Sequence, residues 1–497
     1  MANFYITTPI YYVNGDPHLG TAYAEINADA FARWHRLLGD QVRFVTGTDE
    51  HGLKIAQAAA EHGVTPQEWV DRTSERFRGA WGKLDISFDD FIRTTEPRHV
   101  STVQEFLSEI YRRGYIYKDL YVGLYCISCE AYYQESELVD GKDCPVHGRP
   151  VTEMSEENYF FALSKFNDRL IEFYENNPGA ITPETRLHEV LGFLRQGLTD
   201  ISITRSSIDW GVSVPWDEQH VFYVWYDALI NYLTAVGYGD GSGAFEQWWP
   251  SVHHLLGKDI LRFHAVWWPA MCMAAGIDPP AHFLVTGWML VNGEKMSKSL
   301  GNQIDPMAVA SDLSSDALRY YLLRANGFGL DGDVSLESLY RVYNADLAND
   351  LGNLVSRVVA LSIQKGGGRA PAVPEIGSDP LGAKPLLEGS IAAWNAFRPM
   401  DAIDHAMAIV RAGNSLLERA EPWRRPEGDA ESLDALGRVR EGLRLAAVLL
   451  SPAIPKASLE IFVRLGFGGA GELRWTAEAG GATLEKRPPL FPRAVAG

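Results

Sequence analysis

The chain has 497 residues, 46% of them hydrophobic and 22% charged, and a formal net charge of −19. This length is too great for one ordinary core and predicts about two to four domains, while the apolar and charged fractions are those of a globular protein. The acidic total argues against a nonspecific coat for nucleic acid, which needs an excess of Lys and Arg. A local basic strip that binds RNA is still compatible with it.

Neither a targeting signal nor a membrane segment is expected. The first residues, 1–4, lack the basic region of a secretory signal. The longest apolar run, 263–277, contains His264 and Pro269 and is too short to cross a bilayer. Four cysteines in a chain of this length do not make a disulfide framework. These features predict a cytoplasmic enzyme that does not bind a membrane.

The first part of the chain alternates strand-like and helix-like patterns. The expected order is a strand, a turn, a helix, a second strand and a second helix, over 4–8, 14–17, 18–34, 41–46 and 53–62. This order predicts a parallel sheet with crossover helices, and ligands of such sheets lie at the carboxyl ends of the strands. Residues 7–9 and 47–51 fall at those ends, which makes the Asp49 carboxylate a candidate for binding an ammonium group.

The alternation is interrupted over 117–215, where cysteines, turns and short strands appear, and then resumes. The expected elements are a strand, a helix, a strand-to-turn junction, a second helix and a second strand, over 221–225, from Asp227, and over 254–259, 263–275 and 283–286. From Pro306 the pattern is largely helical, with a Gly/Pro-rich loop over 366–384. We therefore expect a nucleotide-binding sheet in two halves, an insertion between them and a helical C-terminal part.

Two short motifs at predicted strand ends suit phosphate binding. Pro17-His18-Leu19-Gly20 opens the first helix, where backbone N–H groups and the positive end of the helix dipole attract phosphate. Lys295-Met296-Ser297-Lys298-Ser299 lies between Gly293 and Gly301, and its two lysines make a cationic loop that can close over a polyphosphate. Taken singly, the first motif also fits a capping turn and the second a solvated surface loop. Their joint position at strand ends of one sheet favours a nucleotide site.

A third motif has the spacing of a metal site. Cys126-x2-Cys129 is followed after fourteen residues by Cys144-x2-His147, and three thiols with one imidazole at this spacing are typical of tetrahedral zinc. Four protein ligands leave no open position, so the zinc is expected to be structural. The alternative is that these cysteines are small apolar fillers. The fourth cysteine, Cys272, lies in an apolar helix and is expected in the core.

These motifs carry a resemblance to a known family. Lys295 to Ser299 resembles the KMSKS signature of class I aminoacyl-tRNA synthetases, and His18-Leu19-Gly20-Thr21 resembles their HIGH signature. From about Phe4 to Trp423 the chain is similar to methionyl-tRNA synthetases of the bacterial type, which have a single zinc knuckle.

The resemblance implies an α/β fold class in which a Rossmann-like parallel sheet is split by a zinc-binding insertion and followed by an all-α anticodon-binding helix bundle. The two halves of the Rossmann catalytic domain are expected over 1–116 and 216–325, the second half with the KMSKS-like loop. The inserted connective domain with the zinc knuckle is expected over 117–215. The helical linker and anticodon-binding bundle is expected over 326–497.

The resemblance also implies the site residues. The implied methionine contacts are Ile10, Tyr12, Asp49, Trp225, Tyr232 and His264, and aromatic walls suit the polarizable sulfur of a thioether. The implied ATP contacts are His18, Gly20, Thr21, Asp259, Lys295, Ser297 and Lys298, of which His18, Lys295 and Lys298 are catalytic. The implied anticodon contacts are Asn353, Arg357 and Trp423.

The residues alone leave other interpretations of the pocket open. Trp225 and Tyr232 are seven apart and share one helical face if a helix starts at Trp225, and such an aromatic pair is more often core than pocket. Asp259 and Asp227 each follow a predicted strand, where an aspartate suits a helix N-cap as well as a contact with ligand.

The anticodon candidates have a similar alternative. Asn353 and Arg357 are four apart and face the same way along a helix. Arg can bond base edges and Trp423 can stack on an unpaired base, as in the reading of single-stranded RNA loops. Without the resemblance, an exposed polar helix face is the simpler interpretation.

Thr21 departs from the family pattern, which usually has a histidine at this position. A hydroxyl can bond a phosphate oxygen but carries no positive charge. We therefore predict that His18, Lys295 and Lys298 supply most of the phosphate contacts and that Thr21 is secondary.

The implied activity is ATP-dependent activation of methionine to methionyl-adenylate and transfer to the 3' end of tRNA(Met). The implied partners are methionine, ATP with Mg²⁺ and tRNA(Met), with one structural Zn²⁺, and a monomer is expected. The alternatives are another class I aminoacyl-tRNA synthetase, another nucleotidyltransferase with a similar sheet, or an RNA-binding paralogue without catalysis. The zinc knuckle and helical third argue against the nucleotidyltransferase, and Lys295 with Lys298 against the inactive paralogue.

Overall fold

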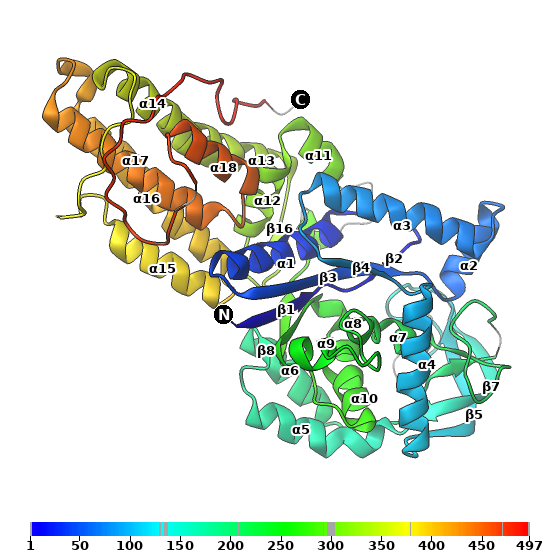
Figure 1. Ribbon diagram of the computed structural model, residues 1–497. Helices are drawn as coiled ribbons and strands as arrows, with labels where there is room; N and C mark the ends of the chain where they lie inside the picture. Colours follow the sequence, from blue (N-terminus) through cyan, green and yellow to red (C-terminus); the bar gives the residue numbers. More distant parts are fainter. Residues whose placement is uncertain are drawn as a thin grey trace. The chain divides into compact units, whose positions relative to one another are not determined.

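The computed structural model describes residues 2–128, 131–133, 138–206, 208–291, 293–295, 304–377, 379–469 and 471–495 (Figure 1). The chain divides into two compact units, each assembled from separate segments. The first unit comprises residues 1–17, 39–82 and 87–286, and the second comprises 18–38, 83–86 and 287–497. The first phosphate-binding motif is therefore divided between units, because Pro17 belongs to the first and His18 to the second.

The first unit contains a seven-stranded sheet in the order β2-β3-β1-β12-β13-β8, with β4 also paired to β3. Its strands are β1 (Asn3–Thr7), β2 (Tyr11–Tyr12), β3 (Gln41–Asp49), β4 (Asp90–Arg93), β8 (Ile181–Thr182), β12 (Val252–Gly257) and β13 (His282–Thr286). Every pairing in it is parallel. The predicted parallel sheet is thus confirmed, and its edge strand β8 comes from the segment expected as an insertion.

Strand β3 is longer than its apolar pattern predicts and continues past Thr46 to Asp49. The added residues pair on both sides, Thr48 with Arg93 of β4 and Asp49 with Tyr12 of β2. Ladder bonds rather than side-chain hydrophobicity therefore set the end of this strand, and they place Asp49 at its last position.

Helices pack around this sheet in the first unit. They are α2 (Leu53–Glu61), α3 (Pro66–Lys83), α4 (Pro97–Arg112), α5 (Asn167–Asn176), α6 (Glu184–Leu194), α7 (Val224–Ala228), α8 (Asn231–Thr234), α9 (Ala244–Trp248) and α10 (Trp268–Ala275). The predicted helix over 263–275 is in two parts, a π-helical turn over Phe263–Trp267 followed by α10. The predicted strand over 221–225 is only β11 (Val221–Phe222), because α7 begins at Val224.

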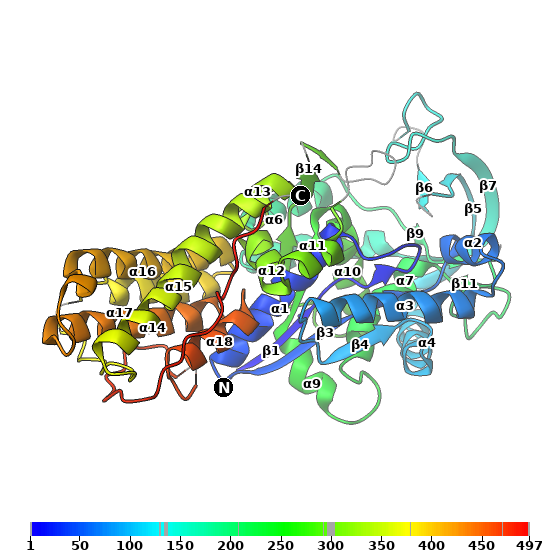
Figure 2. The same cartoon turned by 90° about the horizontal axis from the view of Figure 1, so that it is seen from above.

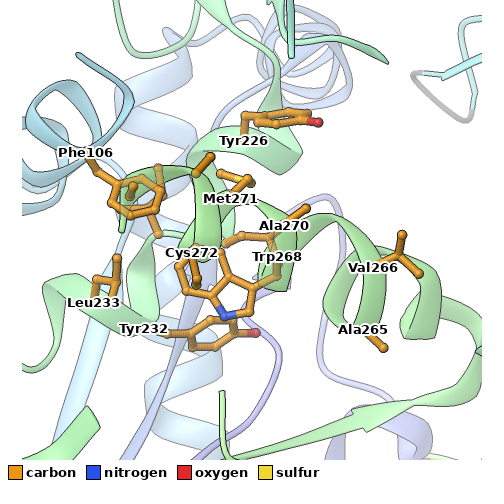
Figure 3. Packing of buried hydrophobic residues seen from close by; sticks show 14 of the residues in the cluster. Phe106, Tyr226, Tyr232, Leu233, Ala265, Val266, Trp268, Ala270, Met271 and Cys272 are labelled. Carbon is orange, nitrogen blue, oxygen red and sulfur yellow. The ribbon is translucent and has the colours of Figure 1, made fainter. Parts of the chain in front are cut away.

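The core of the first unit centres on α10. Trp268, Met271 and Cys272 are fully buried there, which confirms the core position predicted for Cys272. Figure 3 shows the Trp268 indole beside the Tyr232 ring, with ring centroids 6.2 Å apart. Full burial of side chains of this size contributes roughly 1.5–3 kcal/mol each to folding. The packing of this core therefore holds neighbouring residues such as Tyr232 in place.

A smaller antiparallel sheet, in the order β6-β5-β7-β9, occupies the predicted insertion. Its strands are β5 (Ile116–Cys126), β6 (Ala131–Tyr133), β7 (Thr152–Phe161) and β9 (Ile201–Ser202). Strands β5 and β7 pair from Ile116 with Phe161 to Tyr125 with Thr152. The cysteine motif follows directly at the end of this ribbon. A two-stranded pair, β10 (Thr204–Arg205) with β11, closes the segment.

The second unit is mainly helical, as predicted from Pro306 onward. Its helices include α1 (Leu19–Leu37), α11 (Pro306–Asp312), α12 (Ser315–Arg324), α13 (Leu336–Val342), α14 (Asn353–Lys365), α15 (Ala383–Asn395), α16 (Pro399–Ala420), α17 (Ala430–Leu450) and α18 (Pro455–Arg464). In both views α15, α16 and α17, coloured yellow to orange, lie side by side (Figures 1 and 2). A three-stranded sheet, β15-β14-β16, spans Glu294–Lys295, Met289–Val291 and Gly332–Asp333.

A buried ion pair joins α1 to the rest of the second unit. The Arg319 guanidinium of α12 lies 2.6 Å from the Asp29 carboxylate of α1, with both side chains inaccessible to solvent. The same guanidinium donates to the backbone oxygens of Leu84, Pro452 and Ala453. Removal of either charge would leave the other buried without its partner, which typically costs about 3–5 kcal/mol. Among the described helices, none is long and apolar enough to cross a membrane.

Candidate functional site

The candidate methionine contacts all lie in the first unit, and Asp49 is at the carboxyl end of one of its parallel strands. Asp49 ends β3 and is 4% exposed, and Tyr12 of β2 is its partner in the ladder. Ile10 is half-buried in the segment that joins β1 to β2. Burial raises the pKa of the Tyr232 hydroxyl, Asn231 lowers it and the Asp49 charge raises it further.

Tyr232 and His264 form a buried polar pair. The Tyr232 hydroxyl is 2.8 Å from His264 Nε2, and His264 Nδ1 is 3.1 Å from the Ile260 carbonyl oxygen. A carbonyl oxygen only accepts, so Nδ1 carries the proton, Nε2 accepts and the Tyr232 hydroxyl donates. Burial lowers the pKa of His264 to about 4, with a smaller opposing effect of the Ile260 carbonyl. The imidazole is therefore neutral at physiological pH.

Trp225 supplies an aromatic wall. Its ring stacks on Phe263 with centroids 3.9 Å apart and meets His264 edge-on at 6.3 Å. The condition for a shared helical face, one helix through Trp225 and Tyr232, is not met, because the chain breaks into α7 and α8 between them. The two residues are brought near each other through His264 instead of by one helical face.

A buried cluster that the sequence did not predict lies next to Trp225 in the chain. Asp227 is fully buried in α7, and its two carboxylate oxygens lie 2.5 Å from His51 Nδ1 and 2.7 Å from His99 Nε2. Asp227 is inside the helix rather than at its cap, so the N-cap interpretation is wrong. The three residues are too far apart in sequence for any local pattern to signal the cluster.

Asp259 is exposed on a short 3-10 turn, Lys258–Ile260, directly after β12. Its carboxylate packs against Gly257, where a Cβ atom would come within 2.6 Å of Asp259 Oδ1. The turn shows no side-chain cap bond. Exposure at a strand end is what a contact with nucleotide requires.

The first phosphate-binding motif lies in the second unit and starts α1. His18 is the N-cap residue, and its Nδ1 accepts from the backbone N–H groups of Gly20 at 3.1 Å and Thr21 at 3.3 Å. With Nδ1 as acceptor, the proton of the neutral ring is on Nε2, which is therefore a donor. A Cβ atom at Gly20 would come within 3.1 Å of the His18 ring, so glycine allows the ring to lie over the turn.

Thr21 completes this turn. Its hydroxyl donates to the His18 carbonyl oxygen at 2.7 Å and accepts from the His18 backbone N–H at 3.0 Å. Side chain and backbone of the two residues thus form a reciprocal capping box. Thr21, at the position where the resemblance implies a second histidine, therefore bonds both backbone groups of His18.

The cationic motif begins in a hairpin of the second unit, at Lys295 of β15. This hairpin belongs to the sheet β15-β14-β16, so the expected position at a strand end of the parallel sheet is wrong for Lys295. Leu290 of β14 pairs with Lys295 of β15, and the turn between them contains Gly293 at a φ of 76°. The Gly293 N–H also donates to Asp333 Oδ1 at 3.3 Å. The predicted ATP contacts Ser297 and Lys298 lie outside the described residues.

Three of the four predicted metal ligands come together in the first unit. The ligand atoms of Cys126, Cys144 and His147 all lie within 4.8 Å of one another. The turn between the last two is closed by the Gly148 N–H donating to the Cys144 carbonyl oxygen at 2.8 Å. Two thiols and an imidazole are the donors that zinc prefers, so these residues fit that ion. The fourth predicted ligand, Cys129, lies outside the described residues.

A surface pocket of about 430 Å³ lies beside these ligands. Its lining residues are Asn14, Lys54, Gln57, Ile127, Ser128, His147 and Arg149. The Lys54 ammonium also lies 5.5 Å from the centre of the Tyr12 ring. The lining contains Lys and Arg but neither Asp nor Glu, which is notable in so acidic a chain.

The anticodon candidates lie in the second unit. The Arg357 guanidinium is 4.6 Å from the centre of the Trp423 ring, which is 39% exposed. Asn353 is exposed one helical turn before Arg357. An exposed ring with a cation over it and an amide nearby makes a surface that can stack and hydrogen-bond an unpaired base.

Comparisons with known proteins agree along nearly the whole chain. The family model described as "tRNA synthetases class I (M)" matches residues 4–152 and 139–359. The methionine–tRNA ligase of Streptomyces coelicolor is 44% identical over 99% of this chain and 96% of its own, and that of Thermotoga maritima is 42% identical over 99% and 80%. A solved structure of the Mycobacterium tuberculosis methionyl-tRNA synthetase in complex with methionyl-adenylate is 40% identical, covers 99% of this chain and 100% of that chain, and has a TM-score of 0.94. The chain belongs to the class I tRNA synthetases of the methionine type.

Proposed function

We propose that this chain activates methionine with ATP to form methionyl-adenylate and transfers the methionyl group to the 3' end of tRNA(Met). The observation that carries the proposal is the 44% identity with a named methionine–tRNA ligase over 99% of the chain. The bond between Tyr232 and His264, the Trp225 ring beside His264 and the position of Asp49 at the end of β3 support the same substrate.

In the proposed methionine site, the Asp49 carboxylate binds the substrate ammonium. Trp225 and Tyr232 contact the thioether, and Ile10 and Tyr12 complete the wall. The neutral His264 ring suits an uncharged substrate side chain, because it brings no buried charge to the site. Selection against analogues that lack one methylene is limited to about 1–3 kcal/mol in such a pocket.

The proposed phosphate site uses His18, Lys295 and Lys298. A carboxylate oxygen of methionine attacks the α-phosphorus, and the bond to the bridging oxygen breaks to release pyrophosphate. His18 donates from Nε2 to a phosphate oxygen, and the two ammonium groups stabilise the charge that accumulates on the leaving group. Mg²⁺ bound with ATP supplies further positive charge. Gly20, Thr21, Asp259 and Ser297 make the remaining nucleotide contacts, with Thr21 secondary.

We further propose that Cys126, Cys129, Cys144 and His147 hold one Zn²⁺. The ion is structural, because four protein ligands leave no position for water or substrate. It would close the end of the β5–β7 ribbon. Support comes from the proximity of the three described ligand atoms.

For tRNA we propose that Asn353, Arg357 and Trp423 read the anticodon. The division that accompanies this proposal is catalytic segments over 1–116 and 216–325, a connective domain over 117–215 and an anticodon-binding part over 326–497. The cation–π pair of Arg357 and Trp423 supports it, since an ordered guanidinium beside an exposed ring is ready to receive a base.

Methionine-dependent ATP–pyrophosphate exchange and methionylation of tRNA(Met) test the proposal directly. We expect exchange with methionine and none above background with leucine or isoleucine. Exchange with another amino acid but not methionine would assign the chain to a different synthetase. No exchange with any amino acid, together with tRNA binding, would favour the inactive RNA-binding alternative.

A further inference from the structure

The buried carboxylate of Asp227 is bonded to two histidines that come from different parts of the first unit. His51 Nδ1 lies 2.5 Å from Oδ2, and His99 Nε2 lies 2.7 Å from Oδ1. Asp227 and His99 are inaccessible to solvent, and His51 is 6% exposed. Such short bonds to a fully buried carboxylate define the relative position of three backbone segments closely.

The two histidines join Asp227 to different elements of the first unit. His51 lies two residues after Asp49, in the turn that follows β3. This turn is also held by the Trp210 indole, which donates to the Glu50 carbonyl oxygen at 2.7 Å, and its ring packs edge-on against His51. His99 lies in α4, and its Nδ1 is 3.0 Å from the Thr234 hydroxyl of α8. The first histidine therefore joins Asp227 to the strand-end turn and the second joins it to the surrounding helices.

The helix that carries Asp227 also carries an aromatic wall residue. Trp225 is two residues before Asp227 in α7, just as Asp49 is two residues before His51. The bond between His51 and Asp227 is thus a direct link between the segment that bears Trp225 and the segment that bears Asp49. Each of these segments contributes one proposed contact with methionine.

We propose that Asp227 is a positioning residue for methionine: through His51 it sets the spacing between the Asp49 carboxylate, which binds the ammonium, and the Trp225 ring, which contacts the side chain. The inference rests on the proposed function and extends it to residues that do not touch substrate. In this proposal Asp227 and His51 fix the distance between two contacts with the same amino acid.

The protonation state of Asp227 supports the link. Burial alone would raise the pKa of this carboxyl, but the two imidazoles outweigh burial and lower its pKa to about 2. The group is therefore ionised at physiological pH, and an ionised buried carboxylate depends on both of its donors. Loss of either histidine weakens the cluster, but only the loss of His51 separates Asp227 from the turn of Asp49.

That asymmetry allows a test that separates positioning from stability. His51→Ala and His99→Ala each remove one donor from Asp227, so we expect similar falls in the melting temperature of the full chain. In methionine-dependent pyrophosphate exchange, His51→Ala should raise KM for methionine roughly tenfold to hundredfold, the cost of a misplaced binding group. KM for ATP should stay within about twofold of wild type, and His99→Ala should change KM for methionine by less than about threefold.

A conservative pair at the same position guards against loss of folding. His51→Asn places an amide donor where Nδ1 lies, and His51→Gln places it where Nε2 lies. We expect His51→Asn to restore KM for methionine to within about threefold of wild type and His51→Gln to restore it less, at similar melting temperatures. Equal values of KM in Asn and Gln variants, or equal increases in His51→Ala and His99→Ala, would overturn the proposal. Absence of methionine-dependent exchange in the wild-type chain would instead contradict the proposed function itself.

Discussion

The two units hold their candidate site residues in opposite ways. In the first unit the bonds join residues far apart in the chain, as between Tyr232 and His264 or between His51 and Asp227, and the groups are buried. In the second unit His18 is held within four residues of its own helix start and is exposed. The proposed methionine contacts are therefore coupled to the stability of a core, whereas the proposed phosphate contact His18 is held by a local turn. Substitutions in the two units should differ accordingly in how activity and stability change together.

The largest expected effect without a matching loss of stability is at His18. His18→Ala should lower kcat/KM for pyrophosphate exchange by about 10²–10³-fold, as the removal of one preorganised donor usually does. His18→Asn is the control, because asparagine still caps the helix but has no donor where Nε2 lies. Both variants should lose activity alike, and only the alanine should lose about 1 kcal/mol of unfolding free energy. Wild-type activity in His18→Asn would show that His18 acts as a cap.

Two of the predicted metal ligands of the first unit, Cys144 and His147, are joined by a local turn. Substitutions there test whether such a turn can be changed without a change in the core. Cys144→Ser should lower zinc affinity at least about tenfold, because a hydroxyl is a poor zinc ligand. Cys272→Ala removes a buried thiol from α10 and should leave one zinc per chain. Metal content of the purified proteins, measured by atomic emission after dialysis against a weak chelator, distinguishes the two. Equal zinc in both variants would contradict the assigned ligand set.

Tyr232→Phe should lower both the stability of the chain and its affinity for methionine, as expected if the candidate contacts of the first unit depend on its core. His264 Nε2 would lose its buried donor, which costs roughly 1–3 kcal/mol of unfolding free energy. KM for methionine should rise about tenfold, since the shape of the pocket at Tyr232 depends on this bond. Tyr174→Phe is the matched control, because its buried hydroxyl donates to the Ala265 carbonyl oxygen at 2.6 Å outside the proposed contacts. It should lose similar stability and keep KM for methionine.

Substitution of Thr21 should have a smaller effect on activity, because this residue acts through the local turn that holds His18. Thr21→Ala removes the hydroxyl that bonds both backbone groups of His18, and we expect kcat for exchange to fall about threefold to tenfold. Thr21→Ser keeps the hydroxyl and should keep most activity. Steady-state kinetics of the two variants measure the difference. A loss of several orders of magnitude in Thr21→Ala would mean that the hydroxyl contacts the phosphates and is not secondary.

Features that depend on local contacts were predictable from the sequence, whereas those that depend on distant contacts were not. The helix start at His18 and the spacing of Cys126, Cys144 and His147 depend on neighbouring residues, and they were predictable. The end of β3 was not, because pairing with β2 and β4 extends this strand to Asp49. The break between α7 and α8 was missed; Tyr226 and Tyr232 on either side of it are buried, and tertiary packing can override local propensity.

The cluster around Asp227 had no sequence signal for a similar reason. Its two bonds span 176 and 128 residues, and an aspartate after a strand is locally indistinguishable from a helix cap. Thr21 shows the converse case. Its identity was visible as a departure from the family pattern, but its effect on His18 required the geometry of the capping box.

The last expected effect is on stability alone, a pH dependence that comes from buried histidines of the first unit. Burial lowers the pKa of His264 to about 4, whereas a histidine in an unfolded chain titrates near about 6.5. As the pH falls from 6.5 toward 4, the unfolded state binds a proton that the folded state does not bind, so unfolding free energy should decrease. Where the unfolded state binds one full proton more than the folded state, the free energy of unfolding changes by about 1.4 kcal/mol per pH unit. His254, whose ring lies 6.3 Å away and whose pKa burial also lowers, adds to the same window.

Chemical denaturation between pH 4 and pH 7 measures this slope. His264→Gln removes one contributor, so its unfolding free energy should depend on pH less steeply than that of wild type, by up to one proton. His188→Gln, at a side chain that is 68% exposed, is the control and should leave the slope unchanged. Asp227 acts in a separate window, because its lowered pKa means that its contribution is lost only as the pH falls from about 4 toward 2. An unchanged slope in His264→Gln would show that the imidazole can be protonated without unfolding, and the methionine pocket would then be less firmly tied to the core than its buried bonds indicate.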